Sequence, residues 1–329
     1  MAVYTHLGAE DLATLIAHYD VGALVSAKGI AEGVSNSNWL VETERGRFIL
    51  TMYERRIAID DLPFFLGLLD HLSAAGCPVP RTIHDRDGRG WRTVEGKAVA
   101  LIEFLPGVSV DRPTPAQARS VGEALARLHR ASSDFAGTRA NDLQPADWQA
   151  LFERCGADLG GIDPALPALV ERYMPALVER WPSDLPETVI HADLFPDNVL
   201  MIGDRVGGLI DFYFACRDLA AYDLAVTHAA WSFTNDGSRF LPEVGAALIE
   251  GYESARPLTR AERAALPLLA QGAAMRFIST RAYDWLDMPE SALVTRKNPM
   301  DFARRLEFYV EAGDEAFSAG AQEGNRLAR

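Results

Sequence analysis

The sequence contains little cysteine, no long uncharged apolar run and no excess of positive charge. Its three cysteines, Cys77, Cys155 and Cys216, are too few and too widely separated for a disulfide framework or a zinc site. A run of about 18 apolar residues, the minimum for a membrane helix, does not occur. The first residues lack the basic start and apolar stretch of a secretory signal. We therefore expect a cytoplasmic protein without a membrane segment.

The charge balance disfavours nucleic acid as a partner. The chain has 32 basic and 46 acidic residues, which gives a formal net charge of −14 at pH 7. Such a surface repels nucleic acid and anionic lipids. Any anionic ligand must therefore be held by local groups rather than by the overall field. With 329 residues, of which 48% are hydrophobic, the chain is long enough for two lobes with substantial cores.

Apolar periodicity divides the chain into a β-rich part and a helical part. The segments 38–43 and 47–54 flank a turn at residues 44–46 and predict a β-hairpin, and residues 59–76 follow as a helix. From Thr114, a predicted N-cap, the pattern is mostly helical. We predict an α+β, two-lobed architecture with an N-terminal lobe at 1–104 and a helical C-terminal lobe at 105–329. The later predicted helices cover residues 115–132, 164–180, 218–231, 240–254, 259–286 and 299–316.

The stretch "HADLFPDNVL" in the second half contains the densest group of chemically active residues. Asp193 follows His191 by two residues, Asn198 follows Asp193 by five, and Asp211 lies thirteen further on. These intervals match the catalytic loop of kinases, where an aspartate is the base and an asparagine and a second aspartate bind metal. Phosphoryl transfer needs alignment and cationic stabilisation more than covalent chemistry. Asp193 is thus the candidate base and Asn198 with Asp211 the candidate Mg²⁺ ligands, while His191 more readily supports the loop than contacts substrate.

The spacing alone is common, because aspartate and asparagine frequently form loops. Two flanking strand-like segments and the second aspartate, in the expected order, favour the catalytic interpretation. Three other interpretations stay open. One is a kinase of another small alcohol, such as choline, a sugar or an aminoglycoside. Another is a catalytically silent nucleotide-binding module, and the third is a metal-dependent hydrolase that uses His191, Asp193 and Asp211.

These motifs, followed by "DLAAYDLAV", resemble the aminoglycoside phosphotransferase and choline kinase superfamily. Within it, "EGVSNSNWLVET", "FILTMYERR", "DLPFFLGLLDHL", "GKAVALIEFLPG" and "VGEALARLH" resemble the homoserine kinase family of the phosphotransferase-like form. The resemblance runs from about residue 4 to about residue 308. It implies a protein-kinase-like fold and ATP- and Mg²⁺-dependent phosphorylation of the side-chain hydroxyl of L-homoserine, giving O-phosphohomoserine in threonine biosynthesis. The partner it implies is a small amino-acid alcohol, and the oligomeric state is left open.

The resemblance also assigns residues in the first lobe. It implies a phosphate-covering loop with Gly33, Ser35, Asn36 and Ser37, and a hinge at Glu103 to Leu105 whose backbone pairs with adenine. It further implies that Asp223 braces the active-site region, although an aspartate in the first turn of a helix explains that position nearly as well.

The sequence departs from the kinase pattern at three points. Thr51 stands where a third-strand lysine or arginine holds the nucleotide phosphates, and the following helix lacks its glutamate partner. Arg55 or Arg56 just beyond the strand is a candidate substitute. Tyr213 stands at the glycine of D-F-G, which argues against a flexible flip at Asp211.

An amino-acid substrate requires an arginine for its carboxylate and acceptors for its ammonium group. The helical lobe offers candidates, each of which is more often a packing or surface residue. They are Arg139, Asn141, His228, Trp231, Arg276, Thr280, Arg281, Tyr283 and Asp284.

Overall fold

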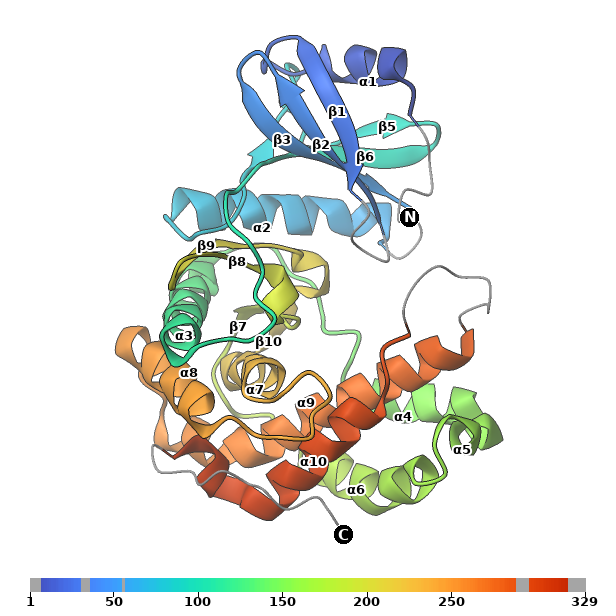
Figure 1. Cartoon of the computed structure of the whole chain (residues 1–329), viewed down its shortest axis with the longest axis vertical. Helices are drawn as coiled ribbons and strands as arrows, with labels where there is room; N and C mark the ends of the chain where they lie inside the picture. Colours follow the sequence, from blue (N-terminus) through green and yellow to red (C-terminus); the bar gives the residue numbers. More distant parts are fainter. Residues whose placement is uncertain (1–6, 31–35, 55–56, 288–295, 319–329) are drawn as a thin grey trace. The chain divides into compact units, whose positions relative to one another are not determined.

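The computed structural model describes residues 7–30, 36–54, 57–287 and 296–318, and the chain forms two compact units (Figure 1). The first unit comprises residues 1–106 and 135–139, and the second comprises residues 107–134 and 140–329. An antiparallel sheet dominates the first unit and helices dominate the second. The predicted α+β class is therefore confirmed. Within the described ranges, no helix has the length and apolar character needed to cross a membrane.

The sheet of the first unit has the strand order β1-β2-β3-β6-β4, with β5 paired to β6. The predicted hairpin is formed by β2 and β3, which pair from Asn36↔Tyr53 to Thr43↔Gly46. One face of these strands packs against α1 (Ala9–Ile16), a helix that the sequence analysis did not identify (Figure 1). The bounds of the strands are Leu24–Ile30 for β1, Asn36–Thr43 for β2, Gly46–Tyr53 for β3, Thr82–Ile83 for β4, Arg92–Val94 for β5 and Lys97–Glu103 for β6.

Helix α2 (Leu62–Ala74) follows a 3₁₀ turn at Ile59–Asp61 and agrees with the helix predicted over 59–76. Residues 135–139 belong to this unit although they follow the first helix of the second unit. The Phe135 ring contacts Phe64 and His71, and Arg139 Nε donates to Asp61 Oδ2 over 3.0 Å. The predicted division of the chain at residue 104 assigns residues 135–139 to the other lobe. Their place in the first unit depends on side-chain contacts, which the sequence does not reveal.

The second unit begins with α3 (Pro115–Ala131), whose N-cap is Thr114 as predicted. The Thr114 hydroxyl accepts the Gln117 N–H, and the Gln117 side chain accepts the Thr114 N–H. The helices of this unit are completed by α4 (Pro145–Cys155), α5 (Leu159–Ile162), α6 (Leu166–Arg180), α7 (Ala220–Trp231), α8 (Pro242–Ala255), α9 (Arg260–Asp287) and α10 (Met300–Ala312). Two short antiparallel pairs lie among them, β7 (Glu187–Ile190) with β10 (Cys216–Leu219) and β8 (Val199–Ile202) with β9 (Arg205–Leu209).

Helix α7 forms the centre of the second unit. Every residue from Ala220 to Trp231 is buried. A helix that is mostly apolar on all sides is stable only when neighbours surround it. Asp223 and the Trp231 indole, which bind the loop at residues 191–194, are therefore fixed by packing before any ligand binds.

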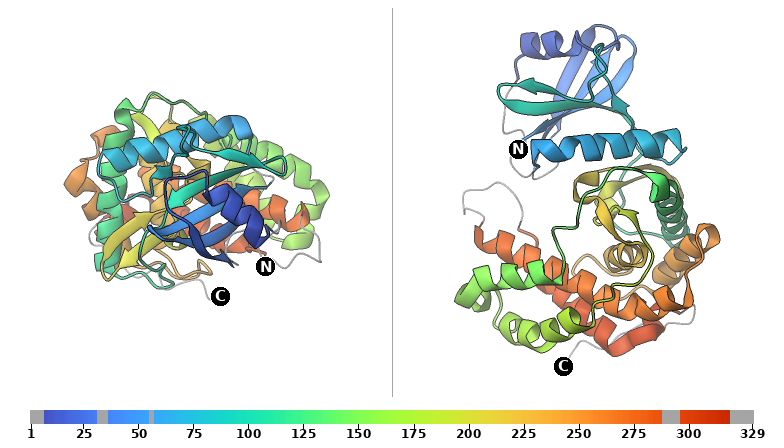
Figure 2. Two further views of the ribbon diagram at one scale, coloured as in Figure 1. Left: turned by 90° about the horizontal axis from the view of Figure 1, so that it is seen from above. Right: turned by 180° about the vertical axis from the view of Figure 1, so that it is seen from behind.

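Helices α3 and α8 lie side by side in the second unit (Figure 2). They approach each other closely at glycines. A Cβ added at Gly122 would lie 2.0 Å from the Leu248 carbonyl oxygen, which belongs to the backbone and cannot move alone. We expect Gly122→Ala to lower the free energy of unfolding by about 1–3 kcal/mol, because the two helices must separate. The measurement is a urea unfolding curve.

The matched control for this prediction is Gly161→Ala on α5, since a Cβ there has no neighbour within 4 Å. Alanine is the better helix former by up to about 1 kcal/mol, so this variant should be neutral or slightly more stable. Equal unfolding midpoints for the two variants would contradict the close-packing argument.

Candidate active site

The predicted catalytic loop, residues 191–198, connects β7 to β8 in the second unit. Strands β8 and β9 pair with Val199 opposite Leu209, and the Ile210 N–H donates to the Asn198 carbonyl over 3.0 Å. This hairpin places Asn198 beside the segment that carries Asp211. Residues that are thirteen positions apart in the sequence therefore meet at one end of the same hairpin.

The Asn198 carboxamide is oriented by Asp193. Its Nδ2 donates to the Asp193 carbonyl over 2.8 Å and lies 3.3 Å from Asp193 Oδ2. A carbonyl oxygen can only accept, so the amide nitrogen must face it. The Oδ1 atom makes no hydrogen bond with the residues that the structure describes. Asn198 is thereby oriented with a neutral, hard oxygen available to a cation.

Asp211 has a left-handed backbone conformation, with φ of 65°. Non-glycine residues seldom adopt this conformation, and those that do gather at functional sites. Desolvation by the surrounding protein, followed by the negative charges of Asp193 and Asp197, raises the pKa of Asp211 from 3.8 to about 7. Because Asp211 is an exposed residue, solvent weakens this field without reversing its direction. The carboxylates of Asp193, Asp197 and Asp211 therefore influence one another at the position where a cation is expected.

The Asp193 carboxyl lies close to positive charge. Arg276 Nη2 is 4.0 Å from its Oδ1. Burial raises the pKa of Asp193 above its ordinary value, and the charges of Arg276, His191 and Lys297 oppose the rise. A carboxylate whose pKa is raised toward the working pH accepts protons more readily than one in water.

His191 is held as a neutral imidazole by two backbone groups. Its Nε2 is 2.9 Å from the Ile210 carbonyl, which can only accept, and its Nδ1 accepts the Asp193 N–H over 3.3 Å. Complete burial lowers the pKa of His191, which also favours the neutral form. His191 thus links the backbone of Asp193 to the residue before Asp211.

Asp223 is the main support of the loop. Its carboxylate accepts the N–H groups of His191 and Ala192, each over 2.7 Å, and lies 2.9 Å from His129 Nε2. Burial by itself raises the pKa of Asp223, but these hydrogen bonds and the neighbouring histidines lower it below its ordinary value. The carboxylate is therefore ionised and holds the two peptide groups that precede Asp193.

The second support is Arg276 on α9. Ala192 has a left-handed φ of 63°, and Arg276 donates to its carbonyl oxygen. The guanidinium carbon lies 5.2 Å from the centroid of the Phe214 ring and 4.6 Å from that of the Phe277 ring. Asp223 holds the N–H of Ala192 while Arg276 holds its C=O, so this strained turn is fixed from both sides.

The predicted nucleotide-binding residues of the first unit are only partly described. Gly33, Ser35 and Arg55 lie outside the described residues. Asn36 is buried, and the Ser37 hydroxyl donates to Glu54 over 2.6 Å. Glu103 ends β6, and the backbone of Phe104 and Leu105 makes no hydrogen bond with any described residue. Unpaired backbone groups at this hinge are what adenine pairing requires.

The position of the missing strand lysine is filled by a neutral pair. Thr51 on β3 is buried, and its hydroxyl donates to Asn38 Oδ1 over 2.8 Å. Hydrogen bonding across β2 and β3 thus replaces the usual ion pair at this position.

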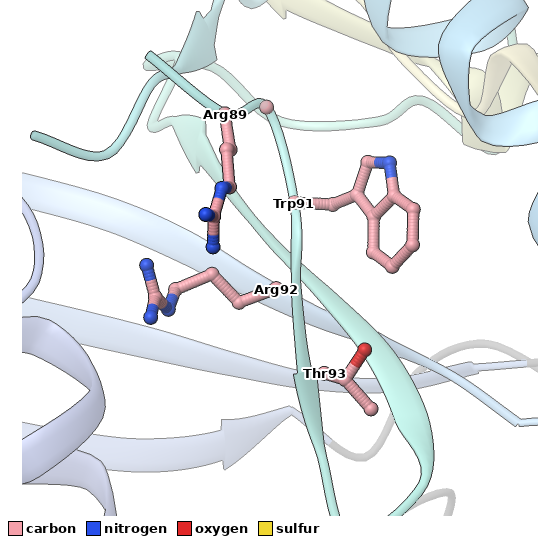
Figure 3. A pocket seen from close by; sticks show the side chains of 5 residues that line it. Arg89, Trp91, Arg92 and Thr93 are labelled. Atoms are coloured by element: carbon pink, nitrogen blue, oxygen red, sulfur yellow. The ribbon is translucent and has the colours of Figure 1, made fainter. Parts of the chain in front are cut away.

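A shallow pocket of about 410 Å³ lies along residues 89–93 of the first unit (Figure 3). Arg89 and Arg92 project from one side of the chain there, and Trp91 and Thr93 project from the other. Arg92 is already paired with Asp85. None of these residues belongs to the predicted site, so we do not place the chemistry in this pocket.

The predicted substrate residues occupy several different environments. Arg276 and Arg281 lie near Asp193, as their mutual charge effects indicate. Trp231 Nε1 donates to the Leu194 carbonyl over 2.9 Å and so supports the loop. The others have structural partners: Arg139 with Asp61, Asn141 with Asp218, His228 with Tyr309, Thr280 with the Arg276 carbonyl and Tyr283 with Arg154, while Asp284 also has an interaction within the chain.

Two residues near the site carry no signal in the local sequence. Lys297 Nζ is 3.8 Å from Asp197 and lies over the Phe195 ring at 5.7 Å. His129 reaches Asp223 from α3. Both lie far along the chain from the motif, and a helical pattern gives no indication of such a contact.

The chain matches the family model described as "Phosphotransferase enzyme family" over residues 26–258. It is 48% identical over 320 residues to the homoserine kinase of Xanthobacter autotrophicus, covering 97% of this chain and 99% of that protein. It is 50% identical over 309 residues to the homoserine kinase of Rhodopseudomonas palustris, covering 94% of each.

Solved structures share the fold at low identity. A spectinomycin phosphotransferase in complex with ADP and spectinomycin superposes with a TM-score of 0.73 at 14% identity, covering 95% of this chain and all of that one. A microcompartment-associated aminopropanol kinase superposes with a TM-score of 0.69 at 22% identity, covering 94% and 98%. The two-lobed phosphotransferase fold expected from the sequence is confirmed by this likeness.

Proposed function

The chain belongs to the homoserine kinases of the phosphotransferase enzyme family, and we propose that it transfers the γ-phosphoryl group of ATP to the side-chain hydroxyl of L-homoserine. The product is O-phosphohomoserine, an intermediate of threonine biosynthesis. The observation that carries the proposal is the connected arrangement of Asp193, Asn198 and Asp211 on one loop and hairpin, in a chain about half identical to homoserine kinases.

We assign Asp193 as the group that accepts the proton. Its carboxylate would accept a hydrogen bond from the substrate hydroxyl and direct the oxygen lone pair toward the γ-phosphorus. As the new O–P bond forms and the bond to ADP breaks, the proton passes to Asp193. Asn198 holds the carbonyl of Asp193, so the carboxylate keeps this orientation.

Asn198 Oδ1 and the Asp211 carboxylate would hold Mg²⁺, which would supply positive charge to stabilise the phosphates. One amide oxygen and one carboxylate suit this ion, because Mg²⁺ fills its remaining positions with waters and phosphates. Within the described residues, no cluster of three or more His, Cys, Asp or Glu side chains is arranged for a metal, so a metal site made of protein ligands alone is not expected there. Burial, followed by the charges of Asp193 and Asp197, raises the pKa of Asp211, and a bound cation would lower this pKa again.

The first unit would hold the nucleotide. The backbone of Phe104 and Leu105 is suited to adenine, and Asn36 with Ser37 ends the loop assigned to the phosphates. Because Thr51 supplies no positive charge, hydrogen bonds carry more of the phosphate binding than in protein kinases.

The charge around Asp193 bears on the alternative substrates. Arg276, Arg281 and Lys297 all interact electrostatically with this carboxylate. These three positive groups favour a substrate that carries a carboxylate over choline or an aminoglycoside, which carry none.

An ADP-release assay with Mg²⁺-ATP and a panel of homoserine, serine, threonine, choline and kanamycin tests the function. We expect homoserine to have the highest kcat/KM and activity to disappear when Mg²⁺ is chelated. Turnover of choline or kanamycin with none of homoserine would refute the proposed substrate. ATP binding without turnover of any alcohol would favour a silent nucleotide-binding module.

A further inference from the structure

Three phenylalanines from separate elements form a wall beside the catalytic loop. Phe195 belongs to the loop, Phe277 to α9 and Phe302 to α10. The ring centroids of Phe195 and Phe277 are 4.9 Å apart, those of Phe277 and Phe302 4.7 Å, and those of Phe195 and Phe302 5.9 Å. We call this group the aromatic wall. It gives a rigid apolar surface two residues from the candidate base.

Arg281 is fixed on this wall at its α10 side. Its guanidinium carbon lies 4.6 Å from the Phe302 ring centroid. Its Nη1 donates to the Asn298 carbonyl over 3.0 Å and to Asp301 Oδ2 over 3.2 Å. Stacking and two hydrogen bonds hold the planar group in one orientation, so little entropy remains to be lost when a ligand binds.

One edge of the Arg281 guanidinium has no partner among the residues that the structure describes. Within the described part of the chain, Nε and Nη2 make no hydrogen bond. This edge presents two parallel N–H donors, which is the geometry that a carboxylate binds in bidentate fashion. The side chain retains 12% exposure, so it is shielded but reachable.

Arg276 and Lys297 are less suited to this task. The Arg276 side chain is 3% exposed and donates to the Ala192 carbonyl, so it already serves the loop. Lys297 is 61% exposed and lies nearest to Asp197, which makes it a mobile point charge rather than an oriented fork. Burial lowers the pKa of Arg281, while the charges of Asp301 and Asp193 oppose that effect. The aromatic wall also links the two residues, because Arg281 lies on Phe302, and Phe302 contacts Phe195, two residues from the candidate base.

We propose that Arg281 binds the carboxylate of the amino-acid substrate through its Nε and Nη2 edge, while the substrate hydroxyl lies at Asp193. This inference rests on the proposed function and adds the residue that separates amino acids from plain amino alcohols. The hydroxyl oxygen and carboxylate carbon of homoserine are roughly 5 Å apart in an extended chain of single bonds. The proposal therefore requires the hydroxyl site at Asp193 and the carboxylate site at Arg281 to lie about one homoserine length apart.

The test compares homoserine with 3-aminopropan-1-ol, which is the same molecule without its carboxylate. Arg281→Met keeps an unbranched side chain on Phe302 but removes the donors. We expect kcat/KM for homoserine to fall about 10- to 100-fold, the usual effect of losing a charged hydrogen bond. The value for 3-aminopropan-1-ol should change less than about threefold.

Arg304→Met is the matched control, because Arg304 also pairs with Asp301, over 2.9 Å, and also donates to the Asp236 carbonyl. It should leave both substrates close to wild type. Arg281→Lys keeps the charge and the pairing with Asp301 but not the fork, so it should show an intermediate loss for homoserine alone. It also provides the measurement if the methionine variant does not fold.

Equal losses for both substrates in Arg281→Met would mean that Arg281 only supports the fold, and the proposal would be wrong. Unchanged homoserine kinetics in either Arg281 variant would overturn it as well. A wild-type enzyme that phosphorylates 3-aminopropan-1-ol but not homoserine would instead refute the proposed function, so the two failures are distinguishable.

Discussion

Replacing Asp193 by asparagine should lower kcat about 10²- to 10⁴-fold, the usual contribution of a positioned general base. Asparagine has nearly the same shape and can still receive the hydrogen bond from Asn198 Nδ2, so the loop should keep its form. The change removes the proton acceptor and the charge that aligns the hydroxyl. Steady-state ADP release gives kcat, and calorimetric titration should find the Kd for ATP within about threefold of wild type.

Asp197→Asn is the matched control, because Asp197 is an exposed carboxylate of the same loop whose ion pair is with Lys297. An exposed pair of this kind contributes about 1 kcal/mol or less, so kcat should fall no more than about fivefold. If Asp193→Asn kept more than a tenth of wild-type kcat, another group would have to accept the proton.

Asp223→Ala should lower the free energy of unfolding by about 3–5 kcal/mol, the typical cost of removing one partner from a buried charged network. The N–H groups of His191 and Ala192 and the imidazole of His129 would all lose their acceptor in a fully buried place. The catalytic loop would lose its support, so activity should be lost with stability. Urea unfolding followed by tryptophan fluorescence measures the first effect.

Glu243→Ala separates this explanation from a simple helix effect. Glu243 is an acid in the first turn of α8, as Asp223 is in the first turn of α7, but it is exposed. Loss of its interaction with the helix dipole should change stability by about 0.3–1 kcal/mol. Equal destabilisation in the two variants would mean that Asp223 contributes only an interaction with the helix dipole, and not the support of the loop.

The arrangement of the proposed catalytic loop could be predicted from sequence because its geometry is local. Asp193 and Asn198 are five residues apart, and the flanking strands carry their own apolar pattern. The proximity of Asp211 to Asn198 could be expected as well, because β8 and β9 form a hairpin, which is also a local structure. The left-handed conformations of Ala192 and Asp211 were not predicted, since only the tertiary contacts stabilise them.

The cationic surroundings of the loop could not be predicted with the same detail. Arg276 and Arg281 occur in a long helix whose amphipathic pattern is weak, and many side chains of that helix are partly exposed. Which of them points to Asp193 depends on how α9 crosses the buried α7. Lys297 lies in a non-helical segment 104 residues beyond Asp193, so neither periodicity nor spacing identifies it. Packing between distant elements decides these positions.

In the first unit, the sequence pattern indicated a sheet but did not identify every strand in it. The β2–β3 hairpin has a clear turn and alternating residues, whereas β1 is largely exposed and lacks an apolar signature. The departure at Thr51 was visible in the sequence, but the Asn38 that bonds it became evident only from the register of β2 and β3.

The Asp223 carboxylate accepts hydrogen bonds from two backbone N–H groups of the loop, those of His191 and Ala192. All three residues belong to the second unit. The loop is therefore ordered when the protein folds, and no nucleotide or alcohol is needed to shape it. Its ordering entropy is lost once per folding event and not once per catalytic cycle. Amide hydrogen exchange at His191 and Ala192 should accordingly be as slow in the free enzyme as with ligands bound, and regulation of this enzyme would have to act on substrate access rather than on the form of its catalytic loop.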